Sequence, residues 1–127
     1  MALRKLLAGA VVAVGMSLGG GSWAATIVNL GFAIDHSGSV SNTNFTLQKE
    51  GLAAALSLIP TTGDVQYRVG VITFGNDVKT LVAPTLVTAA NIGGIQTAIT
   101  SHNRPNTNTT QTAAAIDTLT AAFSTYL

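Results

Sequence analysis

An apolar stretch that runs directly into a polar turn constrains this chain most. Residues 26–34 (TIVNLGFAI) are uncharged, rich in β-branched side chains and too few for a typical helix. Such a run predicts a strand that is buried on both faces. Residues 35–42 (DHSGSVSN) are turn-forming and begin at the carboxyl end of that strand. Open α/β sheets bind ligands at this end, so a candidate site is expected there.

The rest of the chain alternates helical and extended patterns. We expect, in order, a helix from Ser41 or Asn42 to Ile59, a strand at Val65–Phe74, a turn at 75–77, a strand at 78–87, a helix at 88–100, a loop at 101–110 and a helix from Thr112. Pro60 ends the first helix, and Pro84 implies that its strand lies at a sheet edge. Thr112, Ile116, Leu119 and Phe123 predict the apolar stripe of the last helix. This order predicts an α/β fold, an incomplete doubly wound open sheet of about three strands with flanking helices.

Composition limits the possible classes of function. With 127 residues the chain forms one small domain, and only 9% of its residues are charged, against about 25% in typical soluble domains. The formal net charge is +1, which argues against a basic nucleic-acid surface. There is no cysteine, which excludes disulfides, thiolate metal sites and cysteine nucleophiles.

The amino terminus has the layout of a secretory signal. Arg4 and Lys5 precede an uncharged apolar run at residues 6–18, and three glycines and a small-residue segment follow. We expect a signal peptide at residues 1–24, cleaved after Ala24, and a secreted or periplasmic domain at 25–127. The mature chain then has no membrane span. The alternative is a membrane anchor formed by an uncleaved signal, although the apolar run is shorter than the roughly 20 residues that a span requires.

The turn after the first strand offers oxygen ligands. Asp35, Ser37 and Ser39 occupy alternate positions, and Gly38 lets the backbone curl so that three oxygens can point to one place. Hard cations prefer such oxygens. The threonine-rich residues 106–110 precede the last helix and could add a hydroxyl at the same rim.

Three ordered segments resemble landmarks of the von Willebrand factor type A (VWA) domain family. They are Asp35-x-Ser37-x-Ser39 after GFAI, then VGVITFGNDVK at residues 69–79, then TQTAAAI at residues 110–116. The resemblance implies a metal-ion-dependent adhesion site (MIDAS) with Ser37, Ser39 and Thr110 as ligands and Asp35 binding directly or through water. It implies Mg²⁺, with Mn²⁺ or Ca²⁺ as alternatives, and an acidic protein ligand whose carboxylate completes the coordination.

The chain also departs from the family pattern. The family supplies a further aspartate after a fourth strand, which residues 111–127 lack, and Asp117 sits about two turns along the last helix. Asn108 and Thr109 replace the glycines that usually precede the threonine, so Thr109 or Thr112 are alternative ligands. The resemblance covers residues 27–123 but only the first half of the family's fold, so the metal site is expected to be incomplete. A truncated product, a fragment and a partner-dependent half are all compatible with this pattern.

These patterns predict an exported, non-enzymatic binding module. Phosphoryl-transferring hydrolases use an Asp-x-Asp motif, but here Ser37 occupies the second position and cannot supply a proton. The alternative is a structural remnant without a competent metal site that pairs through its open sheet edge. We expect His36 and His102 to be solvent-facing loop residues, Asp77 to be a turn former, and Lys49 and Glu50 to form a solvated helix face. Expected core residues are Phe45, Leu52, Phe74 and Phe123.

Overall fold

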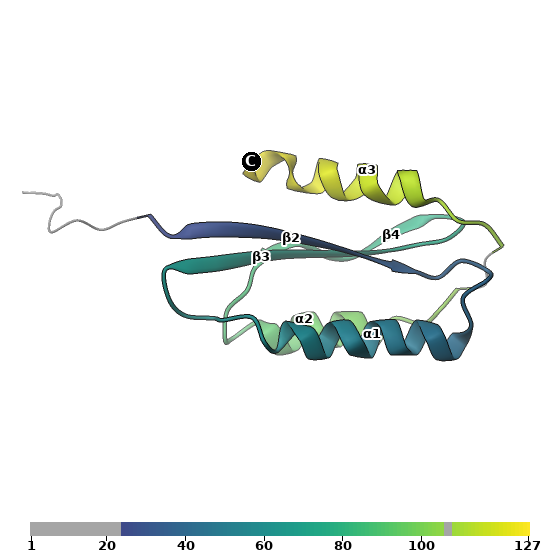
Figure 1. Ribbon diagram of the computed structural model, residues 1–127, viewed down its shortest axis with the longest axis horizontal. Coiled ribbons are helices and arrows are strands. Elements are labelled where there is room, and N and C mark those ends of the chain that lie inside the picture. The colour runs from purple at the N-terminus through teal and green to yellow at the C-terminus, as the bar shows by residue number, and fades with distance from the viewer. Residues whose placement is uncertain (1–23, 106–107) are drawn as a thin grey trace, which may run out of the picture.

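The computed structural model describes residues 24–105 and 108–127 (Figure 1). Its elements are β2 (Thr26–Asp35), α1 (Asn42–Leu56), β3 (Val65–Phe74), β4 (Val78–Leu86), α2 (Ile92–Thr100), α3 (Thr112–Phe123) and a short 3-10 helix, η1 (Ser124–Tyr126). The signal peptide expected at residues 1–24 lies, except for Ala24, outside the described residues. Within the described part, no helix has the length and apolar character needed to cross a membrane.

The three strands form one mixed sheet in the order β2-β3-β4. β2 runs parallel to β3 and β3 runs antiparallel to β4. The parallel register places Asp35 beside Phe74, so the carboxyl ends of β2 and β3 coincide. β4, which contains Pro84, lies at one edge as expected, and β2 lies at the other edge of the described sheet. The prediction that β2 is buried on both faces is wrong, because at this edge only Ile34 of the strand is buried. The expected sheet of about three strands with flanking helices is confirmed.

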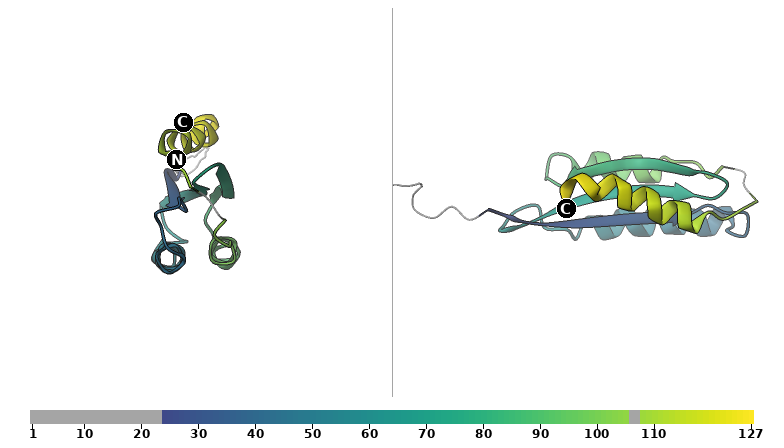
Figure 2. Two further views of the ribbon diagram at one scale, coloured as in Figure 1. Left: turned by 90° about the vertical axis from the view of Figure 1, so that its right-hand side faces the viewer. Right: turned by 90° about the horizontal axis from the view of Figure 1, so that it is seen from above.

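Helices cover both faces of the sheet, which explains its apolar central strand. α1 and α2 lie side by side on one face and α3 lies on the other (Figures 1 and 2). All residues from Val69 to Phe74 are buried, because each side chain of this segment meets a helix layer. Ile34, Phe45, Leu56, Val69, Val71, Ile95 and Ile99 form much of the core beneath α1 and α2, and Ile72, Phe74 and Ala115 cluster on the α3 side.

The first helix begins where the sequence indicates but ends at Leu56 rather than Ile59, because the N–H groups of residues 57–59 bond carbonyls three residues back in a turn. One side chain was also assigned to the wrong face. The Ser41 hydroxyl caps α1 by accepting a hydrogen bond from the Asn44 N–H at 3.1 Å. The buried positions are Phe45, Lys49, Ala53 and Leu56. The expectation of a solvated Lys49 is therefore wrong, because its position continues the apolar stripe. Its neighbour Glu50 is exposed, as expected.

The second helix starts later than expected, at Ile92 rather than at residue 88. Thr88 and Asn91 explain the difference, because each side chain accepts a hydrogen bond from the other's backbone N–H, at 2.8 and 3.1 Å. This local pairing gives the backbone an alternative to the helical hydrogen-bond pattern.

α3 packs closely on the sheet over a pair of glycines. Gly31 of β2 and Gly70 of β3 are neighbours in the register, and a Cβ atom on Gly70 would lie 3.0 Å from two carbons of the Phe123 ring. The predicted stripe of α3 is correct for Leu119 and Phe123 but wrong for Thr112, which is exposed, and for Ile116, which is 60% exposed. Ala115 is buried in its place, because the small side chain faces the sheet and Ile116 lies one position round the helix.

Candidate metal centre

The Gln48 side chain of α1 holds the end of β2 in place. The Gln48 amide oxygen accepts a hydrogen bond from the Asp35 N–H at 3.2 Å, and its amide nitrogen donates to the Asp35 carbonyl at 2.9 Å. One carboxylate oxygen of Asp35 accepts from the Ser37 N–H at 2.8 Å. The carboxylate is therefore fixed over the turn that follows the strand, and Asp35 itself remains partly exposed.

Ser37 is the most enclosed residue of the Asp-x-Ser-x-Ser turn. It is 1% exposed, and its hydroxyl oxygen is buried without a hydrogen-bond partner among the described residues. Its carbonyl accepts from the Val40 N–H at 3.0 Å and from Nη2 of Arg104 at 2.8 Å. Ser39 is exposed. The turn thus presents one buried hydroxyl and one solvent-facing hydroxyl beside the Asp35 carboxylate.

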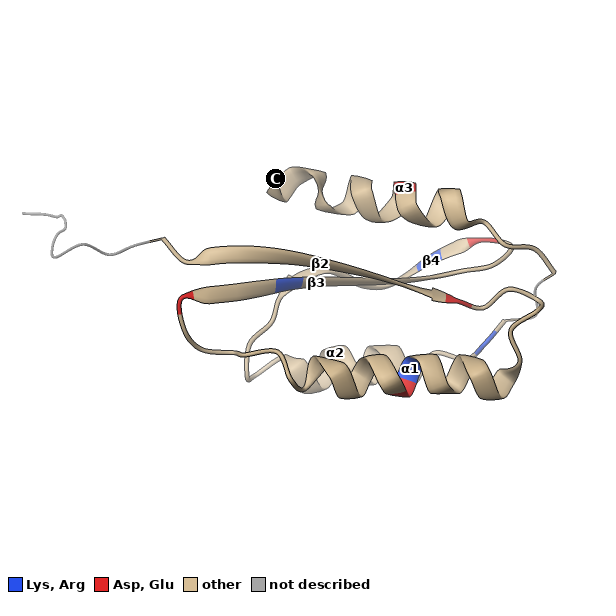
Figure 3. Cartoon of the chain, viewed as in Figure 1, with Lys and Arg blue, Asp and Glu red and all other residues tan. Residues whose placement is uncertain are grey.

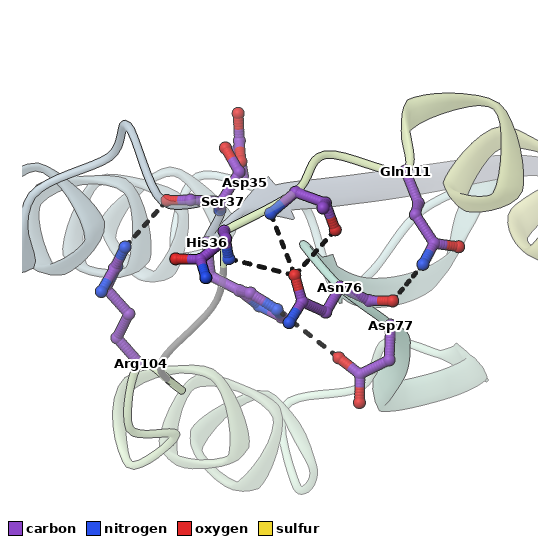
Figure 4. A network of polar contacts seen from close by, with 9 residues as sticks. Asp35, His36, Ser37, Asn76, Asp77, Arg104 and Gln111 are labelled. Atoms are coloured by element: carbon purple, nitrogen blue, oxygen red, sulfur yellow. Dashed lines mark hydrogen bonds and ion pairs between the residues drawn. The ribbon is translucent and has the colours of Figure 1, made fainter.

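Asn76 attaches the threonine-rich segment to the same end of the sheet. Its side-chain oxygen accepts hydrogen bonds from the N–H groups of Asn108 and Thr109 at 3.0 and 2.9 Å, and from the Thr109 hydroxyl at 2.7 Å. The Gln111 amide also donates to the Asn76 carbonyl (Figure 4). Asn76 lies in the turn after β3, whose carboxyl end adjoins that of β2. The two loops expected to meet therefore do come to one rim.

The individual threonines differ in what they can still bind. The Thr109 hydroxyl is engaged with Asn76, whereas Thr110 is exposed and Thr112 is the first residue of α3. Thr109 is therefore the least able of the three to ligate a cation, and the exposed Thr110 and Thr112 remain as candidate ligands. Across residues 24–105 and 108–127, no three residues of the His, Cys, Asp and Glu types gather as a metal-binding group. Any cation here would rely mainly on hydroxyl ligands.

Two histidines pack beneath the rim, contrary to expectation. His36 is fully buried, and His36 and His102 both meet the Phe45 ring edge-on, with centroids 6.3 and 6.2 Å away. Nε2 of His36 lies 3.6 Å from a carboxylate oxygen of Asp77. The prediction of a solvent-facing side chain is wrong for His36, which packs against the Phe45 ring. His102 is partly exposed, although its ring also packs against Phe45 and its Nε2 atom is buried. Asp77 is a turn residue as expected, and it also faces His36.

Burial lowers the pKa of both imidazoles. For His36, desolvation outweighs the attraction of Asp77, and the Arg104 charge lowers its pKa further. For His102, desolvation by burial is the largest cause, and electrostatic interactions with His36, Lys79 and Lys49 lower its pKa further. Both rings therefore favour the neutral form at neutral pH, so neither adds positive charge beneath the rim.

Asn76 and Arg104 are the contributors that the sequence did not reveal. Each acts through hydrogen bonds to segments more than 30 positions away, and no local pattern encodes such pairs. The only signal for Asn76 is its place in a turn at the carboxyl end of β3.

A comparison with protein families decides the classification. The model of the von Willebrand factor type A domain matches residues 29–125. The chain belongs to this family. The resemblance inferred from the three sequence segments is thereby confirmed.

Solved structures agree with this VWA assignment at the level of the fold. The chain is similar to proximal thread matrix protein 1 (PTMP1) from the mussel byssus, in a structure with a zinc-occupied MIDAS motif, with a TM-score of 0.58 and 18% identity. A second crystal form of PTMP1 gives 0.53 and 20%. These matches cover 74% and 68% of this VWA chain but only 24% and 22% of PTMP1. No curated protein matches the chain.

The residues of this VWA domain fit a hard divalent cation in their chemistry. Asp35 offers a carboxylate, Ser37, Ser39 and Thr110 offer hydroxyls, and no nitrogen or sulfur ligand belongs to this set. The buried Ser37 hydroxyl oxygen has no hydrogen-bond partner among the described residues, and a cation ligated there would satisfy it.

Proposed function

We propose that this VWA domain is an exported, non-enzymatic binding module that holds a divalent cation at the rim and engages an acidic protein ligand. Asp35, Ser37, Ser39 and Thr110 are the proposed ligands, and Mg²⁺ is the proposed ion, with Mn²⁺ and Ca²⁺ as alternatives. The observation that carries the proposal is the meeting of the Asp35 turn and the Asn76-tethered threonine segment at one rim (Figure 4).

The charge of this ligand set supports an acidic partner. One carboxylate and neutral hydroxyls leave about one unit of positive charge on a divalent ion, which a carboxylate from a partner can neutralise. Asp117, the acidic residue of α3, is exposed and is not one of the proposed cation ligands. The zinc-occupied motif of PTMP1 supports cation binding in a protein of the same fold. Oxygen ligands alone favour Mg²⁺ over zinc in this chain.

A magnesium titration monitored by thermal unfolding tests the proposal. At ten times the dissociation constant, a bound ion adds about 1.4 kcal/mol of stability, or roughly 5–10 °C in the unfolding midpoint for a domain of this size. Asp35→Ala should abolish the increase. Asp64→Ala is the matched control, because Asp64 is an exposed aspartate at the opposite end of the sheet, and it should leave the increase intact. Equal responses of both variants would refute the proposed ligand.

Export is a separate part of the proposal, which the amino-terminal pattern supports. Amino-terminal sequencing of the protein from the extracytoplasmic fraction should begin at Ala25. A chain that begins at Met1 in a membrane fraction would favour the uncleaved anchor.

The exposed edge of β2 supports a second candidate function, association through the sheet. Among the described strands β2 pairs only with β3, and a groove of about 370 Å³ lies beside it. Its lining is mainly apolar and includes Gly31, Ile116, Leu119 and Phe123. An edge strand presents backbone groups that can pair with another chain.

Sedimentation velocity with and without Mg²⁺ separates the two functions. If association through β2 is the function, the protein should form dimers or larger species without metal, and Ile27→Lys should suppress them by placing a charge on the edge strand. A monomer at all concentrations, with or without Mg²⁺, would contradict it.

A further inference from the structure

A polar recess opens between the start of α1 and the segment that follows α2. It has a volume of about 270 Å³ and is lined by Asn42, Phe45, Thr46, Lys49, Asn103 and Arg104. It adjoins the candidate metal centre, because Arg104 reaches from the recess to the Ser37 carbonyl. No proposed cation ligand lines it, so it is a separate feature of the molecule.

The recess is positively charged, although the domain as a whole has few basic residues. Lys49 and Arg104 are two of the four Lys and Arg residues in the described part, and no Asp or Glu lines the recess. Figure 3 marks the few charged residues along the backbone. Glu50 adjoins Lys49 in sequence but is exposed outside the lining. In the described residues neither cation forms an ion pair with a carboxylate. An anion bound here would meet two charges of the opposite sign.

The two cations offer different groups to a ligand. The Lys49 ammonium group donates to the carbonyls of Thr100 and His102 at 3.0 and 2.6 Å and lies 5.2 Å from the centroid of the Phe45 ring, so it contributes mainly its charge. Arg104 uses Nη2 for the Ser37 carbonyl, whereas its buried Nε has no hydrogen-bond partner among residues 24–105 and 108–127. A buried donor without an acceptor costs free energy, and an oxyanion would supply the acceptor.

We propose that this recess binds a carboxylate, as a second anchoring point beside the metal centre. The guanidinium group presents N–H donors in a planar fork that matches the two oxygens of a carboxylate, and Lys49 adds a point charge. The first turn of α1, at Asn42, directs the positive end of the helix dipole to the same place. The assignment of the carboxylate to the acidic partner rests on the proposed function. Such a partner would present two acidic groups, one for the cation and one for the recess.

Acetate titration of the metal-free protein, monitored by NMR, tests the recess alone. Metal is removed on a chelating resin, because a soluble chelator would itself be a competing carboxylate, and sodium acetate replaces sodium chloride at constant ionic strength. Saturable shifts are expected at the Asn42 and Asn103 amides and at Nε–H of Arg104. Acetamide, which has nearly the same shape without charge, should produce none. Equal shifts with acetamide, or shifts confined to other regions, would overturn the proposal.

Variants assign the binding to the recess. Arg104→Gln should weaken acetate binding at least about tenfold, and Arg104→Lys, which keeps the charge but loses the fork, should fall between this variant and the wild type. Lys79→Gln removes the same charge from an exposed site outside the recess and should change affinity less than about twofold. Native-like spectra of each variant verify folding. Unchanged affinity in Arg104→Gln would overturn the proposal.

Inorganic phosphate, titrated in the same way, tests the chemical class of the ligand. Saturable binding of phosphate without binding of acetate would overturn the carboxylate assignment. The result is independent of the magnesium experiment, because no metal is present. If the protein responds to magnesium but does not bind acetate, only the recess proposal is refuted. If it binds acetate but does not respond to magnesium, only the proposed cation site is refuted.

Discussion

The side-chain oxygen of Asn76 accepts a hydrogen bond from the backbone N–H of Thr109 at 2.9 Å, and so links the turn after β3 to the segment before α3. The same oxygen also accepts from the Asn108 N–H and the Thr109 hydroxyl. One amide group thus positions the segment that carries Thr110 beside the Asp35 turn.

Replacement of Asn76 should therefore weaken cation binding without removing a ligand. Asn76→Ala leaves the segment before α3 without its acceptor, and we expect the apparent magnesium affinity to fall about tenfold, measured by isothermal titration calorimetry. Asn76→Asp retains an acceptor oxygen and should bind more tightly than Asn76→Ala. Equal affinity of Asn76→Ala and the wild type would show that the tether does not position a ligand.

Lys49 is expected to contribute to stability although it is a charged residue on a helix. Lys49→Met keeps the apolar stem but removes both hydrogen bonds to the carbonyls at the end of α2, and we expect a loss of about 2 kcal/mol in chemical denaturation. Glu50→Gln, at the next position but exposed, should change stability by less than about 0.5 kcal/mol. If Lys49→Met left the free energy of unfolding unchanged, these two hydrogen bonds would add nothing to the stability of the folded state.

Sequence patterns predicted the sheet and the rim well because they depend on local periodicity. The apolar runs at β2 and β3 and the proline in β4 indicated strand number and edge position. The position of the rim followed from the rule that open α/β sheets bind ligands at the carboxyl ends of their strands. The burial of Lys49 and His36 was not predictable in this way, because it depends on carbonyls and rings that other elements supply. The same is true of Asn76, whose partners lie more than 30 residues away.

The close approach of α3 to the sheet should make Gly70 intolerant of a side chain. Gly70→Ala places a methyl group 3.0 Å from the Phe123 ring and should cost about 1–3 kcal/mol in the free energy of unfolding. Adding Phe123→Leu should recover part of that loss in a double-mutant cycle. Gly51→Ala, where a methyl group meets nothing within 4 Å, should be neutral or stabilising. Additive losses in the Gly70 and Phe123 pair would contradict the packing account.

The buried histidines predict that stability falls as the solution becomes acidic. Burial lowers the pKa of His36 and His102 below the ordinary value of 6.5, so the unfolded chain binds protons first as the pH decreases. The unfolding midpoint should therefore be steady above about pH 7 and decline below pH 6.5. His102→Gln should reduce the slope of the decline between pH 6.5 and 5. An unchanged slope in this variant would show that His102 does not contribute to it.

Paramagnetic broadening by Mn²⁺ tests the central claim most directly, because it reports where a cation sits. Substoichiometric Mn²⁺ should attenuate the amide signals of residues 36–39 and 109–111 together, and excess Mg²⁺ should restore them. Asp35→Ala should abolish the effect in both segments. Broadening confined to the surroundings of Asp77 or Asp117, or of one segment without the other, would contradict a single cation held between the two loops.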